Sequence, residues 1–335
     1  MLKSNTFKSL IGISALVALL SLTACASREA STASAQERPE IGVVLSDVGL
    51  GDQSYSDAAF RGLVKARDEE GILFDYREMA QTGTYNEAFK QLVEGDNDLI
   101  IGLGYMVKES LETIAEANPD QQFLIVDDTS ELPNVASITF KEEEGSYMAG
   151  VVAGLSTKSG HVGFLGGVES DLLKKFQAGY EQGVKAANPE ADVKAVYAGD
   201  FGKSDLGASI AASMIQDDDI DVVYTAAGLT GVGALQEAQK QGKYAIGVDS
   251  DQFFIAEKAV ITSMIKNVDN AIFSAVQTFN ENDGKFPQKD MVFGLKEEGV
   301  GLAPIRVVEL TSEQQSQIDK LTQDLISGNI TIQLP

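Results

Sequence analysis

The feature that most constrains this chain is an alternation of short apolar runs with longer amphipathic segments. The apolar runs are rich in Val, Ile and Leu and form two series, first at 41–46, 73–79, 98–104, 122–127 and 135–140, then at 161–167, 193–199, 221–228, 243–249 and 259–265. Such strands alternating with helices indicate parallel sheets covered by helices on both faces. Ten strands are unusually many for one open sheet, so the pattern predicts an α/β fold with two doubly wound lobes.

Ligands bind such sheets beyond the carboxyl ends of the strands, so the residues that follow each run are candidate site residues. These residues are Asp47 and the loop after it, 102–105, 127–128, 166–167, 200–201, 228–233, 249–252 and 266. They consist of carboxylates, glycines, a few aromatic side chains and one lysine. A carboxylate accepts two hydrogen bonds from a vicinal diol, glycine lets backbone N–H groups approach a ligand, and aromatic rings stack on a flat base. The set therefore indicates recognition of a sugar or a nucleoside.

Composition and motifs argue against several other classes of protein. The formal net charge of −24 disfavours nucleic acid and an anionic membrane surface as direct ligands. The glycines of "GLTGVG" (228–233) do not have the dinucleotide-binding spacing, and no phosphate-binding P-loop occurs. The single histidine, His161, begins a strand, and "VDSD" (248–251) lacks the oxygen count of a calcium loop. We therefore expect no catalytic residues, no metal and no cofactor.

The N-terminus has the pattern of an export signal. A short basic segment with Lys3 and Lys8 precedes an apolar stretch that is too short to span a membrane well. "LTAC" (22–25) follows and resembles a bacterial lipobox, in which the cysteine becomes the lipidated first residue. We predict a signal peptide at 1–24, lipidation of Cys25, and a flexible tether at 25–38 that leaves the protein anchored to the extracytoplasmic side of the cell membrane.

A series of motifs resembles the basic membrane protein (BMP) family, the substrate-binding lipoproteins of ABC importers that include purine nucleoside receptors. The resemblance covers about residues 39–330, and its motifs are, in order, "DVGLGDQSYSDAAFRG", "VDDTSELPNVASITFKEEEGSYMAG", "VGFLGG", "YAGDF", "YTAAGLTGVGALQEA", "AIGVDSDQ" and "VITSMIKNVDNA". The resemblance implies a type I periplasmic-binding-protein fold with two lobes joined by a three-segment hinge. It places lobe 1 at 39–140 plus 262–284 and lobe 2 at 141–261 plus 285–330.

The same resemblance implies the function and the partners. The protein would be a monomeric receptor, not an enzyme, that captures purine nucleosides in a cleft between the lobes. It would deliver them to an ABC permease and its ATPase, and it would meet the membrane only through its lipid anchor.

Family roles carry over to five polar or small residues. Asp249 and Lys266 would hold the ribose hydroxyls, and Gly228 would offer backbone donors to the same sugar. Asp127 would contact polar atoms of the base, and Asp52 would line the same wall. Aspartate often caps helices as well, so Asp52 and Asp127 also have a purely structural interpretation.

Three aromatic residues and one serine complete the predicted site. Phe201 would stack on one face of the base, and an aromatic residue of the first loop, Tyr55 or Phe60, would stack on the other. Phe60 lies further into the predicted helix and could equally belong to the core. Ser56 stands where the family commonly has asparagine, so it offers a hydroxyl in place of an amide and affects base selectivity more than sugar binding.

Two alternative functions remain open at this stage. A receptor of the same design could bind a free sugar or another small polar metabolite, and ribose competing as well as guanosine would favour it. A secreted nucleoside hydrolase using acids and Ca²⁺ would release the free base, and a chelator would abolish that activity.

Overall fold

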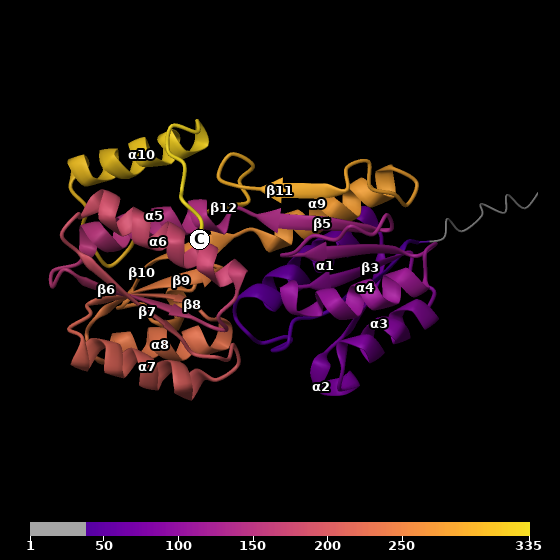
Figure 1. The fold of residues 1–335 in the computed structure, drawn as a ribbon, viewed down its shortest axis with the longest axis horizontal. Helices are drawn as coiled ribbons and strands as arrows, with labels where there is room; N and C mark the ends of the chain where they lie inside the picture. Colours follow the sequence, from indigo (N-terminus) through magenta and orange to yellow (C-terminus); the bar gives the residue numbers. More distant parts are fainter. Residues whose placement is uncertain (1–37) are drawn as a thin grey trace, which may run out of the picture. The chain divides into compact units, whose positions relative to one another are not determined.

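The computed structural model describes residues 38–335 and shows two six-stranded sheets (Figure 1). The predicted signal peptide, Cys25 and the tether up to residue 37 lie outside the described residues. All ten predicted strands are present, and two short ones that were not predicted, β11 (Asp290–Phe293) and β12 (Val300–Leu302), complete the sheets. Within the described range, no helix is both long enough and apolar enough to cross a membrane.

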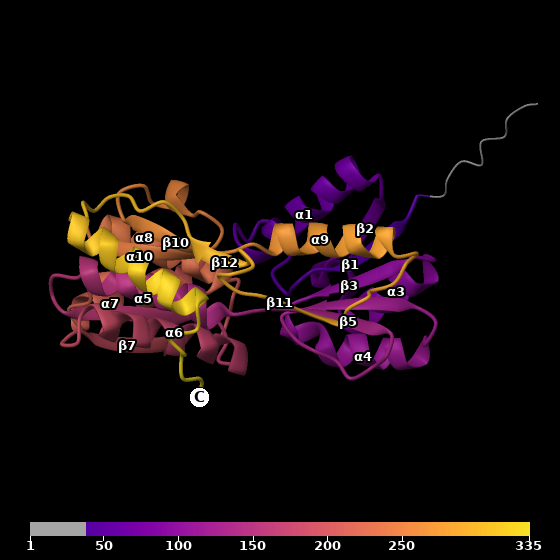
Figure 2. The same ribbon diagram turned by 90° about the horizontal axis from the view of Figure 1, so that it is seen from above.

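The first sheet has the order β11-β5-β4-β3-β1-β2, and all its neighbouring strands are parallel. Besides β11, its strands are β1 (Glu40–Val44), β2 (Leu73–Arg77), β3 (Leu99–Leu103), β4 (Gln122–Val126) and β5 (Val135–Phe140). Figure 2 shows one pair of helices over each face, namely α1 (Tyr55–Glu70) with α9 (Val268–Glu281), and α3 (Tyr85–Glu94) with α4 (Lys108–Ala117). The lobe also contains α2 (Met79–Thr82) and the 3-10 turn η1 (Tyr105–Val107). Because both faces are covered, β3 is buried along its whole length.

The second sheet has the order β12-β10-β9-β8-β6-β7, and only the pair of β12 and β10 is antiparallel. Besides β12, its strands are β6 (His161–Gly166), β7 (Asp192–Tyr197), β8 (Val222–Ala226), β9 (Tyr244–Asp249) and β10 (Val260–Lys266). Figure 1 shows α5 (Glu142–Ser156) and α6 (Asp171–Ala187) on one face, and α7 (Ser204–Asp217) and α8 (Gly228–Lys240) on the other. The remaining elements are η2 (Phe253–Ile255) and α10 (Ser312–Ile326), which packs on α5.

The two sheets share one strand order when β1 to β5 and β11 are matched with β6 to β10 and β12. The strands β4 and β9 therefore occupy equivalent places, and so do the helices α1 and α6, which follow β1 and β6. Loops that are far apart in the sequence become counterparts at the carboxyl ends of the two sheets.

The chain passes between the lobes three times, from β5 to α5, from β10 to α9, and from β11 to β12. The predicted two-lobed fold with a three-segment hinge is confirmed, but two predicted lobe boundaries are wrong. Residues 262–266 belong to β10, which pairs with β9 in the second sheet, whereas 290–293 form β11, which pairs with β5 in the first. The physical reason is that the chain crosses only at the end of β10, and it adds an edge strand to the first sheet before it returns.

The helices α5 and α6 pack with their backbones in close approach. A side chain at Gly183 would begin 1.9 Å from the carbonyl oxygen of Tyr147, and one at Gly179 would begin 2.2 Å from that of Glu143. Only glycine permits this contact. Because α5 starts directly after the first crossing, the packing fixes the first turns of α6 relative to the hinge.

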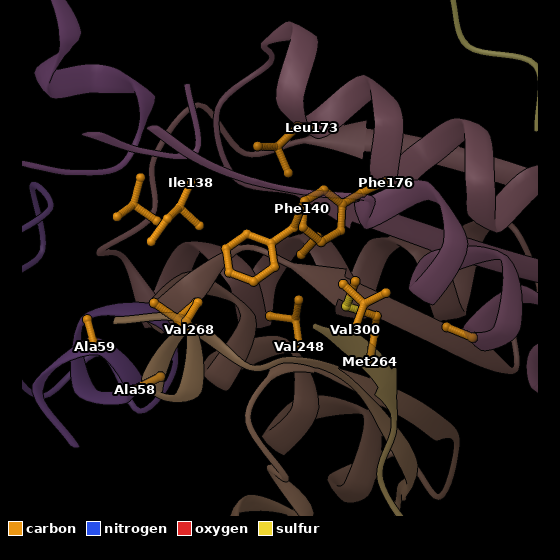
Figure 3. Close-up of a cluster of buried hydrophobic side chains, with 14 of the residues drawn as sticks. Ala58, Ala59, Ile138, Phe140, Leu173, Phe176, Val248, Met264, Val268 and Val300 are labelled. Carbon is orange, nitrogen blue, oxygen red and sulfur yellow. The ribbon is translucent and has the colours of Figure 1, made fainter. Parts of the chain in front are cut away.

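An apolar cluster with members from both lobes lies next to the hinge. Figure 3 shows Phe140, the last residue of β5, near Phe176 of α6, with Val248 and Met264 of the second sheet in the same region. These four residues are almost fully buried. The hinge strands therefore join two lobes that share a continuous core.

Candidate ligand-binding site

A cavity that is partly open to solvent lies at the carboxyl ends of the strands of both sheets, the place where sheets of this kind bind ligands. The first lobe contributes Ser46, Asp47, Val48, Asp52, Tyr55, Leu103, Gly104, Tyr105, Met106 and Asp127. The second contributes Leu172, Leu173, Phe176, Phe201, Ala226, Ala227, Gly228, Val248, Asp249 and Lys266.

The cavity brings together seven of the nine residues predicted from the sequence to bind the ligand. They are Asp52, Tyr55, Asp127, Phe201, Gly228, Asp249 and Lys266. The other two, Ser56 and Phe60, do not line it. The predicted lipidation site, Cys25, lies outside the described residues.

Lys266 carries a buried positive charge at the end of β10, with 2% of its surface exposed. Its Nζ lies 2.7 Å from Oδ1 of Asp127 and 3.0 Å from Oε1 of Glu142. Burial opposes the charged form, but the carboxylates of Asp127, Glu142 and Asp249 outweigh it and raise the pKa of Lys266. The lysine is therefore a permanent cation with two carboxylate partners, as a buried charge requires.

Aromatic rings surround the same ammonium group. Its Nζ lies 4.8 Å from the ring centre of Phe140, 5.4 Å from that of Tyr55 and 5.7 Å from that of Phe176. These distances permit cation–π attraction, which adds to the ion pairs. Rings from both lobes thus restrict where the lysine side chain can go.

Asp249 ends β9 on the cavity wall and accepts a hydrogen bond from the hydroxyl of Ser54 in the other lobe. Burial raises the pKa of its carboxyl to about 6, although the charge of Lys266 and the Ser54 hydroxyl oppose the shift. At neutral pH the group is mostly ionised, and no ion pair joins it to a cation among the described residues. It can therefore accept further hydrogen bonds from a ligand.

Two more hydrogen bonds join the lobes beside that contact. Gln252 Nε2 donates to the carbonyl oxygen of Gln53 at 3.1 Å, and Arg61 donates to the hydroxyl of Ser250 at 3.0 Å. All three bonds connect residues 249–252, at and just after the end of β9, with residues 53–61, which lead into α1 and form its first two turns. The lobes of this structure are therefore in contact along one rim of the cavity.

The acids of the first loop mainly fold the loop itself. The Asp52 carboxylate accepts hydrogen bonds from the backbone N–H groups of Ser54 at 3.0 Å, Ser56 at 2.7 Å and Asp57 at 3.2 Å. It therefore caps the start of α1, and burial raises its pKa. Asp57 accepts two more backbone bonds, from Gly51 and Gln53. Asp52 lines the cavity as predicted, but its oxygens are largely committed to the helix.

Of the two aromatic candidates in the first loop, the structure places Tyr55 at the cavity and Phe60 away from it. Five residues advance an α-helix by about 1.4 turns, so the two rings leave α1 on different sides. Phe60 packs edge-on against Phe74 at 5.6 Å and Tyr76 at 5.8 Å between ring centres. The structure does not place Phe60 at the cavity, because this ring covers β2.

Ser56 is also placed away from the cavity. It is fully buried, its Oγ lies 2.6 Å from the Oγ of Ser46, and its N–H is held by Asp52. Ser56 therefore does not line the cavity, because the helix turns its short side chain toward Ser46, just after β1. Ser46, which does line the cavity, is its hydrogen-bond partner.

Phe201 lies in the loop between β7 and α7, and the start of α8 fixes its backbone. The N–H of Thr230 donates to the carbonyl oxygen of Phe201 at 2.9 Å. Its ring lies so close to Gly167 that a side chain there would begin 2.2 Å from it. Gly228 has a left-handed backbone, with φ of 55°, in the same corner. The ring is thus held in place while it still faces the cavity.

Sequence reasoning missed the apolar wall and one acid. Leu172, Leu173 and Phe176 come from the first turns of α6, where they have the spacing of ordinary core residues. Their position in the sequence could have identified them, since α6 begins just beyond the carboxyl end of β6. Glu142 is one of three consecutive glutamates in the sequence, and only its burial in the structure distinguishes it from the other two.

Residues 38–335 hold no group of three or more side chains that could ligate a metal ion. The two acids of "VDSD" (248–251), which were considered as calcium ligands, have different partners. Asp251 forms a bidentate ion pair with Arg306 at 3.1 and 2.9 Å, whereas Asp249 lines the cavity.

Two doubly wound lobes, three crossings and a cavity at the carboxyl ends of both sheets define a solute-binding protein of the periplasmic-binding-protein type. Residues 40–334 match the family model Bmp, described as "ABC transporter substrate-binding protein PnrA-like". The chain therefore belongs to this family of ABC transporter substrate-binding proteins, and the resemblance seen in the sequence is confirmed.

Individual relatives agree with this assignment. The "CD4+ T-cell-stimulating antigen" of Listeria monocytogenes is 36% identical, with 87% of each chain covered. The "ABC transporter nucleoside-binding protein BmpA" of Lactococcus lactis is 31% identical, with 97% of this chain and 99% of the relative covered. A solved ABC transporter solute-binding protein from Aeropyrum pernix K1 has a TM-score of 0.80 at 26% identity, covering 89% of this chain and 94% of that one.

Proposed function

We propose that this substrate-binding protein captures purine nucleosides between its lobes and delivers them to an ABC importer. The observation that carries the proposal is the pairing, in one cavity, of Asp249 and Lys266 with the rings of Tyr55 and Phe201. A carboxylate and an ammonium suit the hydroxyls of a ribose, and two rings from opposite lobes suit a flat base. The printed name of the Lactococcus lactis relative, a nucleoside-binding protein, agrees with this chemistry.

In this proposal each part of the nucleoside has its own contacts. Asp249 accepts hydrogen bonds from the ribose hydroxyls, and the free N–H of Lys266 donates to the same sugar. Gly228 at the start of α8 offers its backbone, while Asp127 reaches polar atoms of the base. Because the ligand contacts both lobes, it stabilises the closed arrangement in which the lobes meet, and the permease recognises that closed form.

The charge of the cavity favours a nucleoside over a nucleotide. Asp47, Asp52, Asp127 and Asp249 line it together with a single lysine. Lys266 is already paired with Asp127 and Glu142. A phosphate would add negative charge to a wall that has no free cation among the described residues, so we expect guanosine to bind and guanosine monophosphate to be rejected.

Titration calorimetry on ligand-stripped protein tests the proposal. The panel contains guanosine, inosine, adenosine, cytidine, ribose and guanosine monophosphate. We expect heat with the purine nucleosides, little with cytidine and none with the monophosphate. If no nucleoside gives heat, the proposal is wrong, and if ribose alone competes as well as guanosine, the ligand is a sugar. Chromatography of the same mixtures should show intact nucleosides, since a receptor does not release the base.

We also propose that the protein acts as a monomer anchored to the extracytoplasmic face of the cell membrane through lipid on Cys25. The "LTAC" motif after a short apolar segment supports the anchor. Labelling of cells with a fatty-acid analogue should mark the protein, and Cys25→Ser should abolish both the label and the membrane fraction. A label that persists in the variant would contradict this part of the proposal.

A further inference from the structure

Glu142 is a buried acid that contacts the cavity lysine without lining the cavity itself. It is the first residue of α5, directly after the first crossing between the lobes, and only 1% of its surface is exposed. Its Oε1 lies 3.0 Å from Nζ of Lys266, which is its one cationic partner among the described residues. Burying a carboxylate is costly, so its presence beside the hinge calls for a physical reason.

The two carboxylate partners of Lys266 belong to different lobes. Glu142 and Lys266 are both fixed to the second lobe, because the first turn of α5 packs on β10 and β12. A side chain at Gly145 in that turn would begin 2.6 Å from Met264 of β10 and 3.1 Å from Val300 of β12. Asp127, in contrast, follows β4 in the first sheet. A rotation of the lobes about the hinge therefore moves Asp127 away from the lysine and leaves Glu142 beside it.

We infer that Glu142 is a positioning residue that holds the ammonium group of Lys266 at the cavity wall when the lobes are apart. Asp127 joins the pair when the lobes are in contact, as they are in this structure. This inference rests on the proposed capture of a ligand between the lobes, and it adds a role for a residue that does not touch the ligand.

The chemistry of the ammonium group explains why a second partner matters. Asp127 and Glu142 lie 2.7 and 3.0 Å from Nζ as ion-pair partners, so the position of the ammonium group depends on where these two carboxylates lie. With the lobes apart and Glu142 neutral, no carboxylate in contact would direct the cation, and its flexible stem could take several positions. Glu142 thus keeps a donor directed to the cavity before the ligand arrives.

The surroundings of Glu142 add a dependence on pH. The charged and titratable groups that face it are Lys266, Asp127, Tyr55 and Tyr224. Burial raises the pKa of Glu142 to about 7 even though Lys266 opposes the shift. Below neutral pH the carboxyl of Glu142 therefore gains a proton, and its ion pair with Lys266 weakens. This effect of pH can be measured in the wild-type protein, without any substitution.

The first experiment uses ligand-free protein and needs no known ligand. The Nζ–H₃⁺ signal of Lys266, assigned with Lys266→Gln, is followed by ¹⁵N NMR in wild type, Glu142→Gln and Glu143→Gln. Glu143 is a matched control, because it is a partly buried acid on the same helical turn with no ion pair to Lys266. We expect a narrow signal in wild type and Glu143→Gln, broadening in Glu142→Gln, and broadening in wild type below about pH 7. A signal that stays narrow in Glu142→Gln, or in wild type at pH 5 if that variant does not fold, overturns the inference.

The second experiment separates this role from a general loss of structure. In stopped-flow binding of guanosine, Glu142→Gln should lower the association rate about tenfold and change the dissociation rate less than about twofold, because Asp127 still holds the lysine in the closed form. In a Lys266→Gln background the same substitution should have almost no further effect on affinity. Equal losses in both backgrounds contradict the inference. If wild type binds no nucleoside, the proposed function fails, and the NMR result still decides the role of Glu142.

Discussion

The ends of β4 and β9 are equivalent in the two sheets, and each carries an aspartate with a left-handed backbone, with φ of 71° at Asp127 and 63° at Asp249. Their electrostatic surroundings differ. Asp127 lies 2.7 Å from the ammonium of Lys266, whereas Asp249 is held by the hydroxyl of Ser54 and has a pKa raised by burial to about 6. The same place in the fold therefore provides one acid committed to an ion pair and one that remains available to a ligand.

The helices that follow β1 and β6 differ in a similar way. The first turn of α1 brings Asp52 and Tyr55 to the cavity, and the first turns of α6 bring Leu173 and Phe176. The rings of Tyr55 and Phe176 approach the same ammonium group from opposite lobes. One lobe thus supplies most of the acids and the other the apolar wall, although both are built on the same topology.

The largest effect on stability should follow from neutralising Asp127, the acid that is paired with Lys266. Asp127→Asn removes one partner of a buried cation, so we expect a loss of about 3 kcal/mol in the free energy of unfolding, moderated by the remaining Glu142. Urea unfolding at pH 7 measures it. The matched substitution in the other lobe, Asp249→Asn, should cause no such loss, and equal losses at both positions would show that the two acids do not differ.

For ligand binding we expect a large effect at Asp249, the acid that remains available to a ligand. Asp249→Ala should leave the protein folded and weaken guanosine binding more than about tenfold, because a charge-assisted contact with the ribose is lost. Calorimetry measures this, with Asp251→Ala as the control, since Asp251 pairs with Arg306 and does not line the cavity. A change within about twofold for Asp249→Ala would remove that residue from the site.

The third comparison is between Phe201, the aromatic ring of the second lobe at the cavity, and Phe60, which does not line the cavity. Phe201→Ala should weaken nucleoside binding about tenfold, since a stacked base is worth roughly 1–3 kcal/mol. Phe60→Ala should lower stability, because it removes the packing on Phe74 and Tyr76, and leave affinity unchanged. Thermal melting and calorimetry on both variants distinguish these outcomes, and a large affinity loss in Phe60→Ala would contradict the placement seen here.

A further comparison concerns pH and again separates the two acids. The pKa of Asp249 is about 6 in the folded chain and about 3.9 when unfolded, so between these values the folded state binds more protons. The contribution of Asp249 to stability therefore falls as the pH rises from about 4 to 6. Compared with wild type, Asp249→Asn should be more stable at pH 7 by about 3 kcal/mol, and the difference should nearly vanish near pH 4. Melting curves at the two pH values give the sign, and a variant that is less stable at pH 7 would show that the charged form is not disfavoured.

The fold could be predicted largely because its signals are local. The ten longer strands are runs of apolar residues that need burial on both faces, and each appears at its predicted place. The strands β11 and β12 have only four and three residues at the sheet edges, so they lack a comparable pattern. The absence of β11 from the prediction explains why 285–330 was assigned wholly to the second lobe, because β11 returns to a sheet that the chain had already left.

By itself the sequence determined the strand series, the loops that meet at the cavity, and most of the residues that line it. Only the tertiary structure decided what each acid does: Asp52 caps a helix, Asp127 is paired, and Asp249 faces the cavity. The reason is physical. Apolar periodicity is a property of neighbouring residues, whereas the charge state of a buried carboxyl depends on partners such as Lys266 and Glu142, which lie far apart in the sequence and meet only at the hinge.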